Sequence, residues 1–134
     1  AAKFEIEIHR DYAPALPHLL MQRCHLSEVF TNLMQNAREA MDAKGQIAVT
    51  AQFGEGYSVI VTIADNGPGI PAEKLPKIFE PYFTTKERGT GLGLAIVKHN
   101  TEIYGGTVNV ESELGKGTCF TISLPARTVM TIRR

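Results

Sequence analysis

The sequence predicts an α/β fold: a two-layer sandwich in which a mixed sheet is covered on one face by helices. Apolar and polar residues alternate with period two over Lys3 to His9. A long segment from about His25 to Ala43 instead repeats its apolar residues every three or four positions. The rest of the chain adds further strand-like and helix-like segments in a mixed order, which favours helices packed on a sheet.

The first strand and the first helix follow from their periodicity. In Lys3 to His9, Phe4, Ile6 and Ile8 alternate with polar residues, as in a half-buried strand. The apolar stripe of the helix consists of Leu26, Val29, Phe30, Leu33, Met34, Ala37, Ala40 and Met41. One face of a single helix can bury all of these side chains. Lys44-Gly45 is expected to end this helix.

Two strands joined by a tight turn are predicted next. Gln46 to Phe53 is expected to form one strand, and Val59 to Ala64, which is rich in β-branched residues, a second, buried one. Gly54-Glu55-Gly56 between them is typical of a hairpin turn. Pro71 to Glu80 predicts a short helix distorted by its internal proline, and Pro81 to Gly91 predicts a loop.

A second helix and two more strands complete the domain. Leu92 to Tyr104 predicts a helix ended by Gly105-Gly106. Thr107 to Glu111 and Thr118 to Leu124 predict strands on either side of Gly115-Lys116-Gly117. We therefore expect one domain over residues 1–126 and a C-terminal tail over residues 127–134.

Composition excludes several classes of function. The 134 residues include 14 basic and 14 acidic ones, so no excess positive charge points to nucleic acid or to an anionic membrane surface. Cys24 and Cys119 lie far apart and in no metal-like spacing, which fits a reducing compartment. No apolar run approaches the roughly 18 residues that span a bilayer. We expect a soluble, cytoplasmic domain, and the start without Met suggests a piece of a longer polypeptide, which leaves room for a membrane anchor in the parent protein.

Asp65-Asn66-Gly67-Pro68-Gly69-Ile70 follows the buried strand directly. A carboxylate at a strand end can accept a hydrogen bond from an exocyclic amine such as that of adenine. Gly67 and Gly69 lack the Cβ atoms that would keep the backbone away from a flat ring. Asn-Gly and Pro-Gly are also common turn dipeptides, so this segment alone favours a simple turn. The other motifs favour a nucleotide pocket.

Two asparagines and a glycine-rich segment add the groups that a bound nucleotide needs. Asn32 and Asn36 lie one helical turn apart and next to the buried stripe, where an amide oxygen can ligate Mg²⁺ together with water and phosphates. Solvent-facing asparagines are the alternative. Gly89-Thr90-Gly91-Leu92-Gly93-Leu94 precedes the second helix, and free amides at a helix start bind phosphate. Lys86 and Arg88 add positive charge in the preceding loop, or are simply solvated.

These motifs occur in the order of the four boxes of the catalytic and ATP-binding domain of sensor histidine kinases, which the chain resembles. The boxes are Asn36 with Asn32, Asp65 to Gly69, Phe79 to Lys86, and Gly89 to Leu94. The resemblance covers nearly the whole chain, to Gly117 to Pro125, and is strongest to the nitrogen-regulator type. It implies the Bergerat ATP-binding fold, which is shared with gyrase B, MutL and the Hsp-type chaperone ATPases.

The resemblance implies ATP and Mg²⁺ as cofactors and gives each matching residue a role. Asp65 would hold the adenine amine, Gly67 and Gly69 would shape the pocket, and Ile70 would pack near the base. Thr118 would reach Asp65 or the adenine through water.

The same resemblance assigns the phosphate end of the site. Asn36 would ligate Mg²⁺, and Asn32 would support the metal or the phosphates. Lys86 and Thr90 would belong to a lid over the phosphates, so Asn32, Asn36 and Lys86 are the implied catalytic residues. The remaining nucleotide-binding residues, including the glycines that give the lid its hinge and backbone donors, are Gly89, Gly91, Leu92 and Gly93. Phe79 and Phe83 would anchor the lid or pack in the core.

Asn32 also predicts slow ATP hydrolysis. In ATP-hydrolysing relatives this position is typically a glutamate that accepts a proton from the attacking water, and an amide lacks the basicity for that task. A neutral imidazole needs no such base, so transfer to histidine survives. Glu28 lies two turns before Asn36, about 12 Å along the axis at 1.5 Å per residue, too far to replace the base. We expect Glu28 to be a surface or helix-pair charge.

The chain is predicted to lack its own phosphoacceptor. Its four histidines are His9, His18, His25 and His99, and none is followed by the acidic residue and later proline of the family's acceptor box. His25 is expected to pack or cap at the start of the first helix. The resemblance implies an acceptor histidine on a separate dimerisation domain, a response regulator downstream, a monomer for this chain alone and a homodimer for the parent, with no nucleic-acid or membrane partner for this part.

Two other functions stay open at the sequence level. One is a Bergerat-fold kinase acting on serine, against which the Phe79 to Lys86 segment argues; acid stability of the phosphorylated product would identify it. The other is a degenerate nucleotide-sensing or docking domain without activity. Failure to label a supplied histidine-containing domain would favour this last function.

Overall fold

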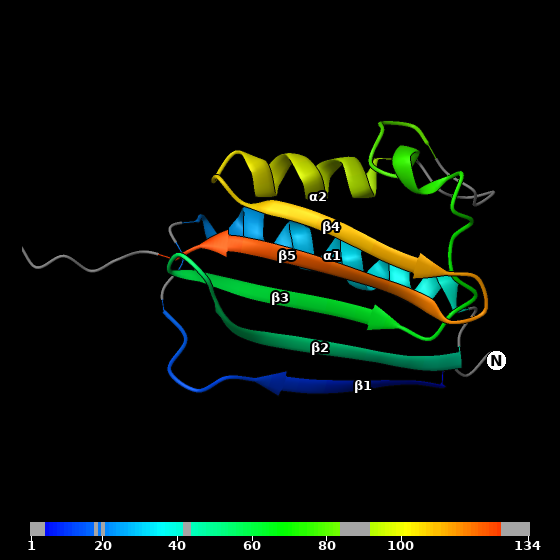
Figure 1. Ribbon diagram of the computed structural model, residues 1–134, viewed down its shortest axis with the longest axis horizontal. Helices are drawn as coiled ribbons and strands as arrows, with labels where there is room; N and C mark the ends of the chain where they lie inside the picture. Colours follow the sequence, from blue (N-terminus) through cyan, green and yellow to red (C-terminus); the bar gives the residue numbers. More distant parts are fainter. Residues whose placement is uncertain (1–4, 18, 20, 42–43, 84–91, 127–134) are drawn as a thin grey trace, which may run out of the picture.

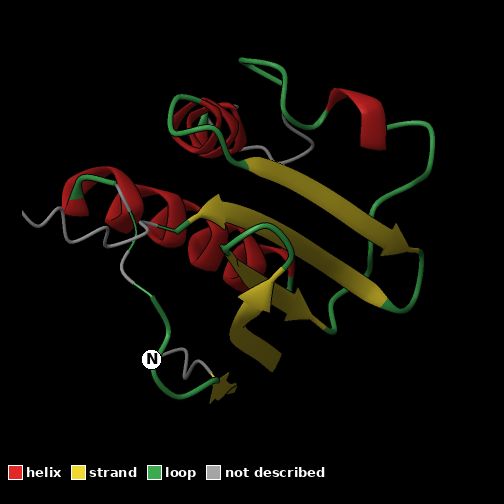
Figure 2. Cartoon of the chain, turned by 60° about the vertical axis from the view of Figure 1, so that its left-hand side comes forward, coloured by secondary structure: helices red, strands yellow, loops and turns green. Residues whose placement is uncertain are grey.

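The computed structural model describes residues 5–17, 19, 21–41, 44–83 and 92–126, and it has the predicted α/β architecture. Five strands form one sheet in the order β1-β2-β3-β5-β4, and both helices pack on the same face of it (Figures 1 and 2). The strands are β1 (Glu5–Tyr12), β2 (Lys44–Gly54), β3 (Ser58–Asp65), β4 (Thr107–Glu113) and β5 (Gly117–Pro125). β1 and β2 are parallel and all other neighbours antiparallel, so the sheet is mixed as predicted.

Alternation along the central strands decides which side chains reach the helices. In β3, Val59, Val61, Ile63 and Asp65 are buried, while the residues between them face the open side of the sheet. β5 follows the same rule, with its buried residues from Thr118 onward spaced by two. The core is therefore a single layer between the sheet and the helices. Its largest fully buried side chains are Phe120, Leu33, Ile47, Ile63, Ile122, Val29 and Val97.

Helix α1 (Arg23–Ala40) supplies the helical side of this core. Val29, Leu33, Ala37 and the following Met41 are buried, and the other large apolar residues of the predicted stripe are partly buried against them. Helix α2 (Gly93–Glu102) lies beside α1 over β4 (Figure 1). Neither of these two described helices is long and apolar enough to cross a membrane.

The turns have the chemistry that the sequence predicted. Between β2 and β3, Gly56 and Tyr57 adopt positive φ angles of 67° and 57°, as in the turns that suit twisted hairpins. After α2, Gly105 has a φ of 81°, and the amide of Gly106 donates to the carbonyl of Thr101 at 3.0 Å. This glycine end of the helix confirms the expected stop.

Three element predictions were wrong in part. Lys44-Gly45 was expected to end the first helix, but α1 ends at Ala40 and these two residues begin β2, where they pair with β1. Pro71 to Glu80 is a series of turns with only one three-residue 3₁₀ helix, η1 (Leu75–Lys77), because Pro76 lies inside it and has no amide hydrogen to donate. β1 extends to Tyr12 rather than ending at His9, since pairing with β2 continues to Ala51 through residues whose polar character hid the strand. The predicted tail, residues 127–134, lies outside the described residues.

Candidate functional site

Asp65 is the last residue of β3 and the centre of the candidate site. Its side chain is on the helix-facing side of the sheet, and the residue is only 8% exposed. It lies between Ile47 on β2 and Thr118 on β5 in the strand register. The amide of Gly67 donates a hydrogen bond of 2.9 Å to Asp65 Oδ1. A carboxylate is thus held at the end of the apolar row Val59, Val61 and Ile63 on the helix-facing side of β3, where it can accept donors from a ligand.

The segment after Asp65 is fixed by backbone contacts to its neighbours. Asn66 prolongs the pairing with β2, because its Oδ1 accepts the amide of Gln46 at 2.8 Å. A Cβ on Gly67 would lie 3.0 Å from Asp65 Oδ1, so a side chain there would crowd the carboxylate. Gly69 has a φ of 81°, and a Cβ on it would lie 2.3 Å from the carbonyl oxygen of Glu113. Gly69 is therefore needed for packing on the β4–β5 turn, and its contact with a base stays a prediction.

The β4–β5 turn also contacts the segment after Asp65. The amide of Gly115 donates to the carbonyl of Pro68 at 2.8 Å. Gly117 has a φ of 103°, and a Cβ on it would lie 2.0 Å from the carbonyl oxygen of Asp65. Asp65 is thus positioned by residues about 50 positions further along the chain, and not by its own turn alone.

Ser112 is a site residue that the sequence analysis missed. Its hydroxyl accepts the amide of Ile70 at 2.7 Å and donates to the carbonyl of Gly117 at 2.9 Å. It also lies 2.9 Å from Thr118 Oγ1. A signal was present, since Ser112 follows Val108 and Val110 at the next inward-facing position of β4, where an apolar residue is expected.

The two predicted asparagines are half-buried on α1. Asn32 Nδ2 donates to the carbonyl of Glu28 at 2.9 Å, and a Cβ on Gly93 would lie 3.1 Å from Asn32 Oδ1. Asn32 therefore lies against the first residue of α2. Asn36 is one turn closer to the end of α1. That end of the helix lies on the same side as the end of β3 (Figure 1).

Glu28 and His25 join the two helices away from Asp65. The amide of Asn100 donates to Glu28 Oε1 at 2.7 Å, so of the two predicted roles, surface charge or helix-pair charge, Glu28 has the second. His25 Nδ1 lies 2.5 Å from the hydroxyl of Tyr104, which also accepts the amide of Gln22 at 3.3 Å. His25 thus packs at the start of α1, as expected.

Only part of the predicted phosphate loop can be placed. Lys86, Gly89, Thr90 and Gly91 lie outside the described residues. Leu92 precedes α2 and its carbonyl accepts the amide of Ile96 at 2.9 Å, which confirms that the glycine-rich motif runs into a helix start.

The aromatic residues next to this loop belong to the core. Phe79 and Phe83 are partly buried against the main cluster, and the Phe79 ring meets Phe120 edge-on at 6.1 Å. Packing in the core is thus their observed role, and a role in anchoring the lid stays a prediction.

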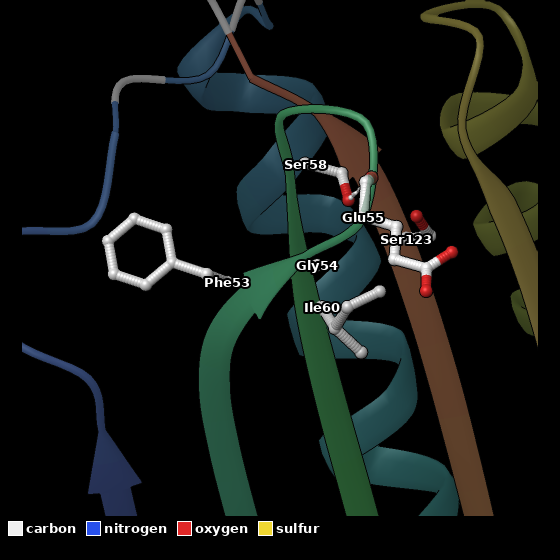
Figure 3. A pocket seen from close by; sticks show the side chains of 6 residues that line it. All are labelled: Phe53, Gly54, Glu55, Ser58, Ile60 and Ser123. Carbon is white, nitrogen blue, oxygen red and sulfur yellow. Dashed lines mark hydrogen bonds between the residues drawn. The ribbon is translucent and has the colours of Figure 1, made fainter.

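The described motif residues gather at one end of the sheet. The end of β3, the β4–β5 turn, the end of α1 and the start of α2 all lie on the right in Figure 1. A separate open hollow of about 540 Å³ lies at the opposite end of β3, by the β2–β3 turn. Figure 3 shows its lining, in which the Phe53 ring points away from the other residues. None of the predicted site residues lines this hollow.

Comparisons with known proteins agree with this geometry. The profile of the family described as histidine kinase-, DNA gyrase B-, and HSP90-like ATPase matches residues 22–128. The chain is 44% identical over 121 residues to sensor histidine kinase ZraS of Escherichia coli strain K12, covering 90% of this chain and 26% of ZraS. It is 39% identical over 130 residues to the sensory histidine kinase/phosphatase NtrB of Rhodobacter capsulatus, covering 88% of this chain and 36% of NtrB.

A solved structure supports the same class. The catalytic domain of histidine kinase ThkA superposes with a TM-score of 0.80 and 34% identity, over 90% of this chain and 79% of that domain. NtrB and ZraS both match, so the nitrogen-regulator type is one of several similar kinases. The chain spans 26% to 36% of the length of the two curated relatives.

Proposed function

Because the chain belongs to the family of histidine kinase-, DNA gyrase B- and HSP90-like ATPases, we propose that it is the ATP-binding kinase module of a sensor histidine kinase. It binds Mg-ATP and positions the γ-phosphoryl group for transfer to a histidine on a separate dimerisation domain, from which a response regulator receives it. The observation that carries the proposal is the buried Asp65 carboxylate, held by the Gly67 amide at the end of β3, on the same side of the molecule as the end of α1 and the start of α2.

Asp65 recognises the base in this proposal. A carboxylate can accept several donors at once, so the bond from Gly67 is compatible with a second one from the adenine amine. Its low exposure strengthens that bond, since water competes little at a buried site. Met41 belongs to the apolar core cluster and Ile70 packs against that cluster, and a Cβ on Gly67 would lie 3.3 Å from Met41 Cγ, so apolar surface borders this segment, in keeping with a flat ring.

The donor set fits magnesium held mainly by phosphates. Among the described residues, no three His, Cys, Asp or Glu side chains gather where they could hold a metal. Mg²⁺ binds in just this situation through phosphate oxygens, waters and one or two protein oxygens, and Asn36 would supply an amide oxygen. The bound ion would neutralise the phosphates, while Lys86, Thr90 and the glycines of the loop would cover them.

Transfer to histidine is favoured over hydrolysis by the residues of α1. Asn32 cannot act as a general base, and Glu28 lies two helical turns before Asn36, about 12 Å along the axis, where its carboxylate is bonded to Asn100 at 2.7 Å. Neither residue can therefore activate a water molecule beside the metal. A histidine nitrogen needs no such activation, and correct positioning of the reactants then supplies most of the rate.

Calorimetric titration with a non-hydrolysable ATP analogue, with and without Mg²⁺, tests the proposal. Asp65→Asn should weaken binding by roughly tenfold to a hundredfold, the equivalent of one hydrogen bond to a charged group. Asp11→Asn makes the same chemical change at an exposed residue of β1 and should leave binding unchanged. Absence of binding by the unaltered chain would contradict the proposal and favour a docking role.

A second experiment tests the transfer step. The chain is mixed with radiolabelled ATP and a histidine-containing dimerisation domain of a related kinase. Acid-labile label should appear on the added domain and none on this chain alone. Acid-stable label would instead indicate a serine kinase.

A further inference from the structure

Ser112 lies in the same row of residues as Thr118 and Asp65, where its hydroxyl can decide whether Thr118 donates or accepts a hydrogen bond. It is on β4, in register with Thr118 on β5, and Thr118 is in register with Asp65 on β3. All three residues belong to the helix-facing side of the sheet. They form one row across three strands, which ends at the Asp65 carboxylate.

The three contacts of the Ser112 hydroxyl determine where its proton lies. A serine hydroxyl has one hydrogen to donate and two lone pairs to accept. The Gly117 carbonyl, at 2.9 Å, can only accept, so Ser112 donates its hydrogen there. The Ile70 amide, at 2.7 Å, can only donate and takes one lone pair. The remaining contact, 2.9 Å to Thr118 Oγ1, therefore has Thr118 as the donor.

The orientation of Thr118 follows from this assignment. Thr118 is only 5% exposed, and its single hydroxyl hydrogen is directed to Ser112. Toward Asp65 and the candidate base site it can therefore present only lone pairs. An ionised Asp65 also presents only acceptors. Two neighbouring acceptors suit a base edge that donates, as the adenine amine does, and oppose the exocyclic carbonyl oxygen that guanine carries in its place.

We propose that Ser112 is a specificity-determining residue: by holding the Thr118 hydroxyl as an acceptor, it makes the site prefer adenine over guanine nucleotides. The proposal rests on the proposed ATP-binding function and extends it to a residue that does not itself contact the base. Without the Ser112 hydroxyl, Thr118 can rotate and donate to guanine. In the unaltered chain, a bound guanine leaves a buried acceptor without a donor, which costs binding free energy; without the Ser112 hydroxyl this cost disappears.

The test compares the affinities for non-hydrolysable ATP and GTP analogues in the presence of Mg²⁺. Ser112→Ala should lower the ATP preference by about tenfold, the effect of one hydrogen bond. Ser112→Thr retains the hydroxyl and should restore the preference. Ser58→Ala removes another serine hydroxyl that donates to a backbone carbonyl, at the far end of β3, and should leave both affinities unchanged.

A double-mutant cycle separates specificity from structural support. Thr118→Val should lower the ATP preference on its own, and adding Ser112→Ala to it should lower the preference no further, because the hydroxyl to be oriented is gone. Thr118→Val also serves alone if Ser112→Ala does not fold. An equal loss of affinity for both analogues in Ser112→Ala would overturn the proposal and make Ser112 a purely structural residue.

The unaltered chain separates this inference from the proposed function. Binding of ATP without preference over GTP would overturn the role of Ser112 and leave the kinase module standing. Binding of neither analogue would overturn both.

Discussion

The two ends of the sheet are closed by tight turns, but they are held in different ways. At the β2–β3 turn, the hydroxyl of Ser58 donates to the carbonyl of Glu55, three residues away, at 2.8 Å. At the Asp65 end, the hydroxyl of Ser112 accepts the amide of Ile70, 42 positions away, at 2.7 Å. The first turn can form by itself, whereas the second contact exists only once the sheet is assembled.

The difference explains why the candidate site lies at the Asp65 end. A ligand site needs groups from several segments held in one geometry, and long-range backbone contacts provide that. The β4–β5 turn fixes Pro68 and Asp65 from outside their own loop. The hollow at the other end is lined almost wholly by the β2–β3 hairpin and has no comparable support.

Two glycine substitutions should show the largest difference in stability between the two ends of the sheet. Both Gly56 and Gly117 have positive φ, which costs an alanine about 1 to 2 kcal/mol. A Cβ on Gly56 meets nothing within 4 Å, whereas one on Gly117 lies 2.0 Å from the Asp65 carbonyl oxygen. Gly117→Ala should therefore lose roughly 1 to 3 kcal/mol more than Gly56→Ala through overpacking. Urea unfolding of both variants measures this difference. Equal losses of unfolding free energy would mean that the Asp65 end accommodates an added Cβ as readily as the β2–β3 turn does.

Much of the fold could be predicted because its signals are local. The stripe of α1 from Val29 to Met41 needs only one face of a helix to be apolar, and the β-branched run before Asp65 needs only a buried strand. Asp65 was identified because it follows such a run directly and because the other motifs along the chain favour a nucleotide pocket. The glycine stop after α2 is equally local, since the φ of Gly105 is the cause of the stop.

The rest of the site could not be predicted because its partners are remote. A serine in a strand is common. Ser112 has its role only because β4 is in register with β5 and because the amide of Ile70, 42 positions earlier, donates to its hydroxyl. Gly69 was expected to make room for a ring, yet its close contact is with Glu113. Glycine spacing shows where a side chain is excluded, and only the tertiary structure shows which neighbour excludes it.

Ser58→Ala should have a smaller effect, confined to the hairpin end. The variant loses one hydrogen bond to Glu55 and should cost about 1 kcal/mol in unfolding free energy. Because Ser58 and Asp65 are at opposite ends of β3, the affinity for an ATP analogue should not change. Urea unfolding and calorimetric titration measure the two quantities on the same sample. A loss of affinity would show that the two ends are coupled through the strand.

The smallest effects should appear in the reactivity of the two cysteines, one near each end. Cys24 is exposed at the start of α1, whereas burial raises the pKa of the Cys119 thiol on β5, beyond the opposing effect of its hydrogen bond with Thr121. The raised pKa leaves less thiolate at about pH 7.5, so Cys119 should react several-fold more slowly with a disulfide reagent than Cys24. Single-cysteine variants, Cys24→Ser and Cys119→Ser, assign each rate, and the rates should converge in denaturant.

The carboxylates near Cys119 should change its reaction rate by the smallest amount. The negative charges of Glu111 and, to a lesser extent, Asp65 also raise the pKa of Cys119. Removing either charge should therefore lower that pKa, increase the thiolate fraction and speed the reaction, with Glu111→Gln acting more strongly than Asp65→Asn. Cys24, at the opposite end, should react at an unchanged rate in both variants. If Asp65→Asn slowed Cys119 instead, the substitution would have closed the end of the sheet around the thiol, and its effect on nucleotide binding would report packing as well as the lost carboxylate.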